Sequence, residues 1–252
     1  MPLLLLCAFS FFAGLIDAIV GGGGLVQLPA LLILLPGQGI PTLFGTNKLA
    51  SAAGTTMATA QYARRVKLDW HIIGPAAGTA FIFSALGSKM VTLINPALLR
   101  PVILVLLILV AVYVFVLKDL GLVHAPRHPR HKARWMAILT GAAIGFYDGF
   151  FGPGTGSFLI IIFVGMFGFD FLFASASAKV INLATNLASV IFFAATGHIL
   201  YQVALPMAAC NILGAMAGTR LAILKGSRFV RVFFLVVVLA LIAKLARDLV
   251  AG

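Results

Sequence analysis

Residues 14–24 read GLIDAIVGGGG, and residues 145–156 read GFYDGFFGPGTG. Each stretch is an apolar run that contains one aspartate, Asp17 or Asp148, and ends in several glycines. Inside a helix glycine costs about 1 kcal/mol relative to alanine, and Pro153 lacks a backbone N–H. Both stretches therefore predict a helix that breaks at its glycines. The predicted breaks contain Gly21, Gly22, Gly23 and Gly24 in the first stretch and Gly152 and Gly154 in the second.

The similarity of these two stretches extends along most of the chain. An ungapped shift of 131 residues aligns residues from about 14 to about 105 with the second half of the sequence. Chance similarity between apolar segments would match leucine and valine, but not aspartate, lysine, proline and glycine at one fixed offset. We therefore predict an internal duplication. Identical residues on this shift include Gly14 and Gly145, Asp17 and Asp148, Lys48 and Lys179, Pro75 and Pro206, Gly87 and Gly218, and Arg100 and Arg231.

The composition assigns the duplicated chain to the membrane. Of the 252 residues, 62% are hydrophobic and only 10% are charged, and the mean hydropathy is +1.13. A membrane-spanning helix needs about 20 predominantly apolar residues, and such stretches recur along the sequence. A soluble protein of this size could not bury so much apolar surface. We predict an all-α polytopic membrane protein whose N-terminal apolar segment is retained rather than cleaved as a signal peptide, because the same pattern recurs internally.

Each copy divides into four apolar segments, which gives six to eight spans in total. The first copy occupies residues 1–117 and the second 135–252, and a basic cytoplasmic linker with five Lys or Arg residues joins them at 118–134. The predicted segments are 2–35, 43–63, 69–88 and 97–117 in the first copy, and 135–167, 171–195, 200–221 and 229–249 in the second.

The number of times segment 2–35 crosses the membrane decides the relative orientation of the copies. At about 1.5 Å per residue this segment is too long for one straight span. If it crosses once, the repeats are parallel, and the Lys and Arg residues outside the core divide ten against six between the two sides. If it folds back at its glycines, the repeats are inverted and the division is twelve against four. The positive-inside rule favours the steeper asymmetry, and so the inverted arrangement.

Polar residues inside the apolar segments predict a binding site. A lysine within the bilayer costs a few kcal/mol, so Lys48 and Lys179 are expected to face an aqueous path, although snorkelling near a segment start is an alternative. Asn182 and Asn186 share one helix face. The glycine-rich breaks offer backbone amides to an anion, or else they only permit close helix packing. The candidate substrate-binding residues are Gly21, Gly22, Gly23, Gly24, Asn47, Lys48, Gly152, Gly154, Lys179, Asn182 and Asn186.

The two intramembrane acids have two interpretations. Asp17 and Asp148 are among only six acidic residues in the chain. Each could relay a proton in coupled transport. A structural role is the alternative, in which each aspartate caps the broken helix or pairs with a lysine.

Other function classes are excluded by missing signatures. The net charge of +12 lies at segment ends, and no nucleic-acid-binding module accompanies it. Nucleotide P-loop, hydrolase and metal-ligand motifs are missing, so we predict no enzyme, no cofactor and no metal. The two cysteines, Cys7 and Cys210, are expected to be small packing residues.

Four motifs together carry a family resemblance. The sequences FFAGLIDAIVGGGGLVQLPALL (11–32), GTNKLASAAGT (45–55), GFYDGFFGPGTGSF (145–158) and AKVINLATNLAS (178–189) resemble the TauE/SafE family of sulfite exporters. The resemblance covers nearly the whole chain. It implies a bacterial inner-membrane permease with seven or eight spans in two similar halves, which moves sulfite, sulfoacetate or related anions. The motif residues of the family correspond here to Asp17, the glycines of both breaks, Asn47, Lys48, Asp148, Lys179 and Asn182.

The sequence thus predicts a secondary carrier or exporter for a small anion, with sulfite, a sulfonate or a related organic anion as substrate. The site is expected at the interface of the repeats near the bilayer midplane. Its expected partners are the anionic substrate, the lipid bilayer and a coupling ion, either a proton or sodium. An anion channel, or a membrane subunit that does not itself transport, is the alternative.

Overall fold

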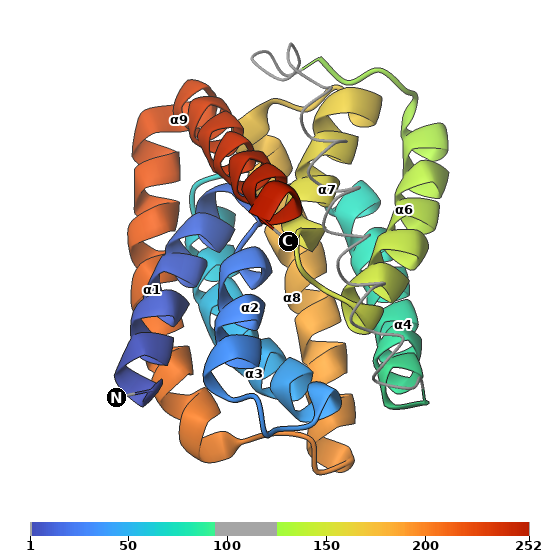
Figure 1. Cartoon of the computed structure of the whole chain (residues 1–252). Helices are drawn as coiled ribbons and strands as arrows, with labels where there is room; N and C mark the ends of the chain where they lie inside the picture. The colour runs from blue at the N-terminus through green and yellow to red at the C-terminus, as the bar shows by residue number, and fades with distance from the viewer. Residues whose placement is uncertain (1, 94–124, 252) are drawn as a thin grey trace.

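The computed structural model describes residues 2–93 and 125–251 of the chain (Figure 1). All of the regular structure in these two ranges is helical. The predicted segment 97–117 and the first part of the linker lie outside the described residues. The helices are α1 (Pro2–Val20), α2 (Gly24–Leu34), α3 (Ile40–Ala63), α4 (Trp70–Leu93), α6 (Arg130–Phe150), α7 (Thr155–Ile162) continued by the π-helix η1 (Phe163–Phe167), α8 (Phe171–Ala195) and α9 (Tyr201–Ala251).

Several of these helices are long and apolar enough to cross a bilayer, as predicted. Among the described residues there are four such candidates, Pro2–Val20, Trp70–Leu93, Phe171–Ala195 and Tyr201–Val230. Two shorter apolar helices, Gly24–Leu34 and Thr155–Phe167, accompany them. The protein is therefore a polytopic helical membrane protein.

The predicted helix breaks are confirmed. Helix α1 ends at Val20, and α2 begins only at Gly24. Gly21 between them has φ +78°, a left-handed conformation that glycine adopts readily. In the second break Gly152 has φ +91° and Gly154 has φ +84°. In both places the glycines turn the chain between two helices.

Two element boundaries differ from the prediction. Helix α6 begins at Arg130, so the last residues of the linker predicted at 118–134 are helical rather than a surface loop. The extended residue Pro129 directly precedes it, as suits the start of a helix. The predicted segments 200–221 and 229–249 are joined in α9, which kinks at Gly226 with φ +69°.

Two pairs of parallel helices flank a central pair. In Figure 1, α1 packs beside α9 on one side and α4 beside α6 on the other, with α3 and α8 between them. Equivalent close contacts recur at positions 131 residues apart. Gly14 of α1 leaves no room for a side chain against Asn211, and Gly145 of α6 leaves none against Ala80. Small residues that allow such backbone approach are typical of helix interfaces in membranes.

The central helices α3 and α8 run in opposite directions. Lys48, early in α3, donates to Asn186, late in α8, across 3.2 Å. Thr59, late in α3, donates to the carbonyl of Lys179, early in α8, across 3.2 Å. The first part of α9 runs parallel to α3, since Gly45 packs on His198 and Gly54 on Asn211. Helix α2 therefore returns the chain toward the end of the molecule where α1 began, as a hairpin does (Figure 1).

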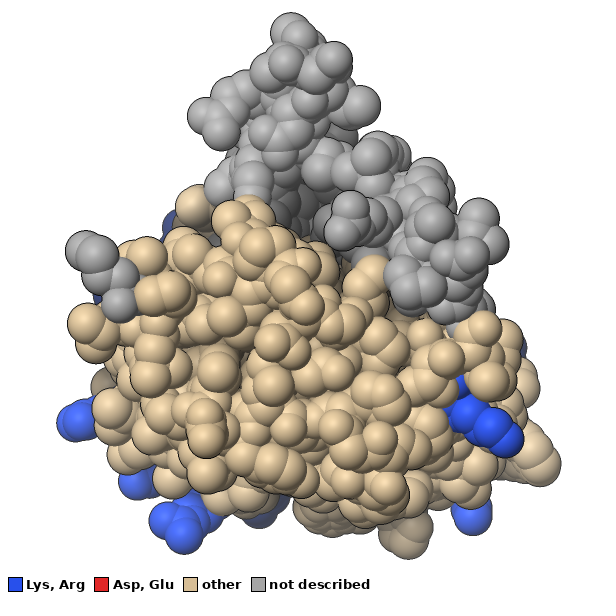
Figure 2. Space-filling view, turned by 60° about the horizontal axis from the view of Figure 1, so that its bottom comes forward, with Lys and Arg blue, Asp and Glu red and all other residues tan. Residues whose placement is uncertain are grey.

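The charged residues gather near one end of the bundle. The α3–α4 loop contains Arg64, Arg65 and Lys67. A pocket is lined by His71 at the start of α4 and by Arg130 and Arg134 at the start of α6. Figure 2 turns the other end, with the α2–α3 and α8–α9 loops, toward the viewer. In that view most of the surface is uncharged, with Lys and Arg only at the edges and no acidic side chain in sight.

Candidate functional site

Two buried ion pairs connect the halves of the chain. Lys48 Nζ lies 2.8 Å from Asp148 Oδ2, and Lys179 Nζ lies 2.7 Å from Asp17 Oδ2. Each lysine is the ninth residue of its helix, α3 or α8. Each pairs with the aspartate of the other predicted repeat, so the two bridges are equivalent under the 131-residue shift.

These four side chains are almost completely removed from solvent. The exposed fraction is 3% for Lys48, 2% for Asp148 and 0% for Lys179, whereas Asp17 retains 17%. Removing two ions from water costs several kcal/mol each, and their mutual attraction often does no more than balance that cost. A buried pair is therefore weak evidence for stability, and ionised residues within membrane segments are candidates for a functional site.

The Lys48–Asp148 pair is contacted by side chains of the second half that have no identical counterpart at the equivalent positions of the first half. The hydroxyl of Thr155, at the start of α7, lies 2.7 Å from Asp148 Oδ1 and 2.7 Å from the carbonyl oxygen of Gly152, and it can donate to either. Asn186 accepts from Lys48 Nζ and donates through Nδ2 to Thr55 Oγ1 across 3.3 Å. On the 131-residue shift Thr155 corresponds to Gly24 and Asn186 corresponds to Thr55 itself.

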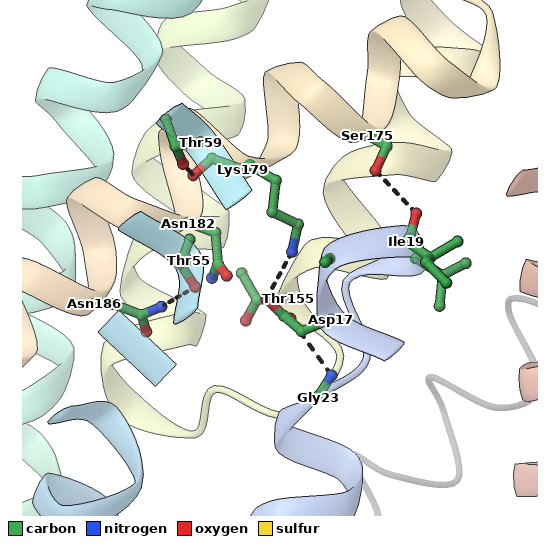
Figure 3. A network of polar contacts seen from close by, with 12 residues as sticks. Asp17, Ile19, Gly23, Thr55, Thr59, Thr155, Ser175, Lys179, Asn182 and Asn186 are labelled. Carbon is green, nitrogen blue, oxygen red and sulfur yellow. Dashed lines mark hydrogen bonds and ion pairs between the residues drawn. The ribbon is translucent and has the colours of Figure 1, made fainter. Parts of the chain in front are cut away.

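The Asp17–Lys179 pair has fewer such contacts. Asp17 Oδ1 accepts a long hydrogen bond of 3.4 Å from the backbone N–H of Gly23, and Asp17 Oδ2 meets Lys179 (Figure 3). The N–H of Gly21 is bound by the carbonyl of Asp17. The carboxylate of Asp17, a residue of α1, thus lies at the start of α2. The N-terminal end of a helix attracts negative charge. Part of the glycine cradle predicted for a substrate anion is therefore filled by the protein's own carboxylate.

The first break is in direct contact with the start of α7, which follows the second break. A side chain on either Gly21 or Gly156 would collide with the backbone of the other. The N–H of Ser157 donates to the carbonyl of Gly21 across 3.3 Å, and its hydroxyl donates to the carbonyl of Val20 across 2.8 Å. The start of α7 is in this way joined to the end of α1.

A small cavity lies between the breaks and the central helices. It measures about 20 Å³, room for about one water molecule. Within the described part of the chain, the buried amide oxygen of Asn47 has no hydrogen-bond partner. Such an atom is costly unless a ligand or water satisfies it. The cavity is lined by Asp17, Gly21, Gly24, Asn47, Lys48, Ser51, Asp148, Gly152, Thr155, Gly156, Asn182 and Asn186.

Most of the predicted site residues come together at this cavity, and four lie just outside its lining. Lys179 lies behind Asp17, to which it is paired. Gly23 donates its N–H to Asp17, and Gly154 precedes α7 in a left-handed conformation. A side chain on Gly22 would make only ordinary contacts of 3.6 Å or more.

Comparison with known proteins identifies the family of this chain. The family model described as sulfite exporter TauE/SafE matches residues 6–245. The chain belongs to the TauE/SafE family. A probable membrane transporter protein of a Sinorhizobium species is 36% identical over 241 residues, covering 95% of this chain and 90% of that protein. A probable membrane transporter protein of Haemophilus influenzae is 35% identical, over 98% of this chain and 95% of that protein. The probable membrane transporter protein YfcA of Escherichia coli K12 is 33% identical, over 98% of this chain and 91% of that protein. No solved structure matches this chain.

Some residues of this TauE/SafE protein were not predicted to belong to the site. Ser51, Thr155 and Gly156 line the cavity, and Ser157 joins the breaks. The 131-residue shift carries a signal for Ser51, because it aligns that residue with the predicted site residue Asn182. No comparable signal marks Ser157, which aligns with Val26.

The described residues of this TauE/SafE protein offer no obvious metal centre. Nowhere in residues 2–93 and 125–251 do three or more His, Cys, Asp or Glu side chains come together as metal ligands. What the site does offer around one small space is the ammonium group of Lys48, two carboxylates, three amides and two hydroxyls, with the ammonium group of Lys179 directly behind Asp17. That set is suited to binding a polar ion.

Proposed function

We propose that this TauE/SafE protein is a secondary carrier of the bacterial inner membrane that moves a small anion, with sulfite or a small sulfonate as substrate. The observation that carries the proposal is the pair of equivalent Lys–Asp bridges around a small cavity between the two halves. The family name supports sulfite as a substrate. The names of the relatives support transport across a membrane.

The anion is proposed to bind where positive charge and hydrogen-bond donors face the cavity. Lys48 lines the cavity, and Lys179 stands behind Asp17. The amides of Asn47, Asn182 and Asn186 line it as well and can donate to the oxygens of an oxyanion. The positive ends of α2 and α7 add to the attraction for negative charge. Lysine acts here as a compact point charge rather than as a bidentate clamp.

The two halves are proposed to be inverted repeats. The antiparallel course of α3 and α8, which occupy equivalent positions in the two copies, supports this arrangement. So does the exchange of partners, since α1 of the first copy packs on α9 of the second, and α6 of the second packs on α4 of the first. Inverted repeats with broken helices and a midplane site are a recurring design of secondary transporters.

The alternatives are an anion channel and a subunit that does not transport. A channel requires a continuous pore, whereas the backbones of Gly21 and Gly156 touch beside the cavity. This contact favours a carrier, in which the breaks move between two states.

Reconstitution of the purified protein in liposomes tests the proposal. The panel of labelled anions contains sulfite, sulfate, methanesulfonate, sulfoacetate and acetate. A carrier gives saturable efflux of at least one sulfur oxyanion, with counterflow when unlabelled anion is present on the opposite side. Flux that rises without saturation supports a channel, and no flux above that of protein-free liposomes supports the subunit.

A further inference from the structure

We propose that Asp17 is a proton-binding site that couples transport to protons, so that the cavity admits an anion only when Asp17 carries a proton. This inference rests on the proposed function. It further assigns the coupling ion, the residue that binds it and the stoichiometry.

The charges around the cavity are balanced before any substrate binds. Two lysines and two aspartates form two ion pairs, so the four groups sum to zero. An anion entering this space adds a negative charge that no ionised side chain among these four is free to balance. Such a charge is expensive inside a membrane protein. A positive companion that enters with the anion restores the balance, and a proton on one carboxylate is the smallest such companion.

Asp17 is the carboxylate suited to take the proton. It lines the cavity and is 17% exposed, whereas Asp148 is 2% exposed. Asp148 is also held by the hydroxyl of Thr155 at 2.7 Å, while the equivalent position beside Asp17 is Gly24, which has no side chain. The difference between Thr155 and Gly24 belongs to the sequence itself. The Lys48–Asp148 pair accordingly stays intact while the Asp17–Lys179 pair opens.

The other titratable groups around Asp17 are few. Lys179 approaches from α8, and the buried Tyr62 of α3 donates its hydroxyl to the carbonyl of Ala18. Lys48 and Asp148 face Asp17 across the cavity. The sequences of α2 and α7 contain no titratable side chain. On α9, Cys210 lies next to Cys7, and Arg220 is exposed. Lys179 is therefore the charged group in direct contact with Asp17.

The backbone at the first break favours a proton over sodium. Broken helices that bind sodium do so through free backbone carbonyls. Here the carbonyls that surround the break already accept hydrogen bonds from protein donors. Those of Asp17, Ala18, Ile19, Val20 and Gly21 accept, in order, from Gly21 N–H at 2.8 Å, Tyr62 hydroxyl at 2.9 Å, Ser175 hydroxyl at 2.9 Å, Ser157 hydroxyl at 2.8 Å and Ser157 N–H at 3.3 Å.

The replacement of the Asp17 carboxylate by the anion as the counter-charge of Lys179 leaves the net charge of the site unchanged. A proton binds an oxygen of Asp17 and neutralises the carboxylate, which leaves the ammonium of Lys179 without a counter-charge. The anion enters and supplies that charge, so the loaded site is again neutral. Release reverses both steps on the other side. One proton therefore accompanies each monovalent anion in the same direction, and both the empty and the loaded carrier cross without net charge in the site.

Liposomes with the membrane potential clamped test the coupling, with labelled methanesulfonate as the probe because its charge is constant over the working pH range. A gradient of one pH unit should support an accumulation of about tenfold, the ratio equivalent to that proton gradient. Asp17→Asn, which imitates the protonated carboxyl, should exchange methanesulfonate across the membrane but accumulate none. Asp148→Asn is the matched control at the equivalent position, and any flux it retains should still respond to the pH gradient.

Calorimetry on the wild-type protein in detergent makes the test independent of variant folding. Titration of methanesulfonate in two buffers of different ionisation enthalpy should give an uptake of about one proton per anion bound. Flux or binding without proton uptake would overturn the coupling and leave the proposed function standing. Loss of pH dependence in Asp148→Asn, with its retention in Asp17→Asn, would show that the proton binds Asp148 and not Asp17. No flux of any anion in the panel would instead overturn the proposed function itself.

Discussion

At the scale of single residues, the site depends on which lysine meets which aspartate. The sequence indicates that Asp17, Asp148, Lys48 and Lys179 are unusual, because ionised groups are rare in membrane segments. It does not reveal that each lysine pairs with the aspartate of the other half. That exchange depends on how the two copies pack together, and a pairing within one copy satisfies the sequence equally well.

Breaking the more deeply buried pair should damage the fold. Lys48→Ala leaves Asp148 buried without its counter-charge, which we expect to cost about 3–5 kcal/mol. Lys48→Met combined with Asp148→Asn leaves no unpaired charge and keeps an acceptor for Thr155, so it should be less destabilised than the single variant. Thermal unfolding in detergent measures both, with the exposed Lys225→Ala as control. Equal losses in the single and double variants would show that the unpaired charge of Asp148 is not what destabilises the single variant.

At the scale of elements, the breaks are the feature that sequence reasoning predicts best. Runs of glycine are unfavourable inside a helix, and both breaks occur where the glycines lie. The contact between Gly21 and Gly156 was not predicted, because it is a tertiary contact between the first break and the start of α7, which belong to different copies. Helix α6 also begins earlier than expected, since the basic residues after Arg130 suit a solvated loop as well as a solvated helical turn.

The contact between the breaks predicts unequal effects of two similar substitutions. Gly156→Ala places a methyl group against the backbone of Gly21, and overpacking of this kind costs about 1–3 kcal/mol. Gly22→Ala, in the same glycine run, meets only atoms at 3.6 Å or beyond and should change stability by less than about 0.5 kcal/mol. Thermal unfolding of the two variants compares them directly. Equal stability would show that the breaks are not in contact in the membrane.

At the scale of the whole molecule, the duplication and the positive charge predict the topology together. The charge distribution favours inverted copies, and the antiparallel helices α3 and α8 agree with that orientation. The segment at 97–117 lies outside the described residues, so its predicted crossing stays a prediction. The number of spans depends on it, and hydropathy does not distinguish a complete crossing from a hairpin of the kind formed by α1 and α2.

Cysteine accessibility tests the inverted topology. Single cysteines replace exposed residues in a background without Cys7 and Cys210. Arg65→Cys, Lys132→Cys and Leu224→Cys probe the basic end, while Gln38→Cys and Thr196→Cys probe the opposite end. An impermeant thiol reagent should label the last two in intact cells and the first three only after lysis. Labelling of Leu224→Cys in intact cells, with Arg65→Cys protected, would require parallel repeats.

The paired charges at the centre should carry the anion, and a double variant that neutralises one pair tests this. Asp17→Asn combined with Lys179→Gln removes the more exposed pair without leaving an unpaired charge. Counterflow of labelled sulfite into liposomes should then fall to the level of protein-free liposomes, whereas the exposed Lys225→Gln should behave as the wild type. Counterflow at the wild-type rate in the doubly neutralised protein would contradict the account.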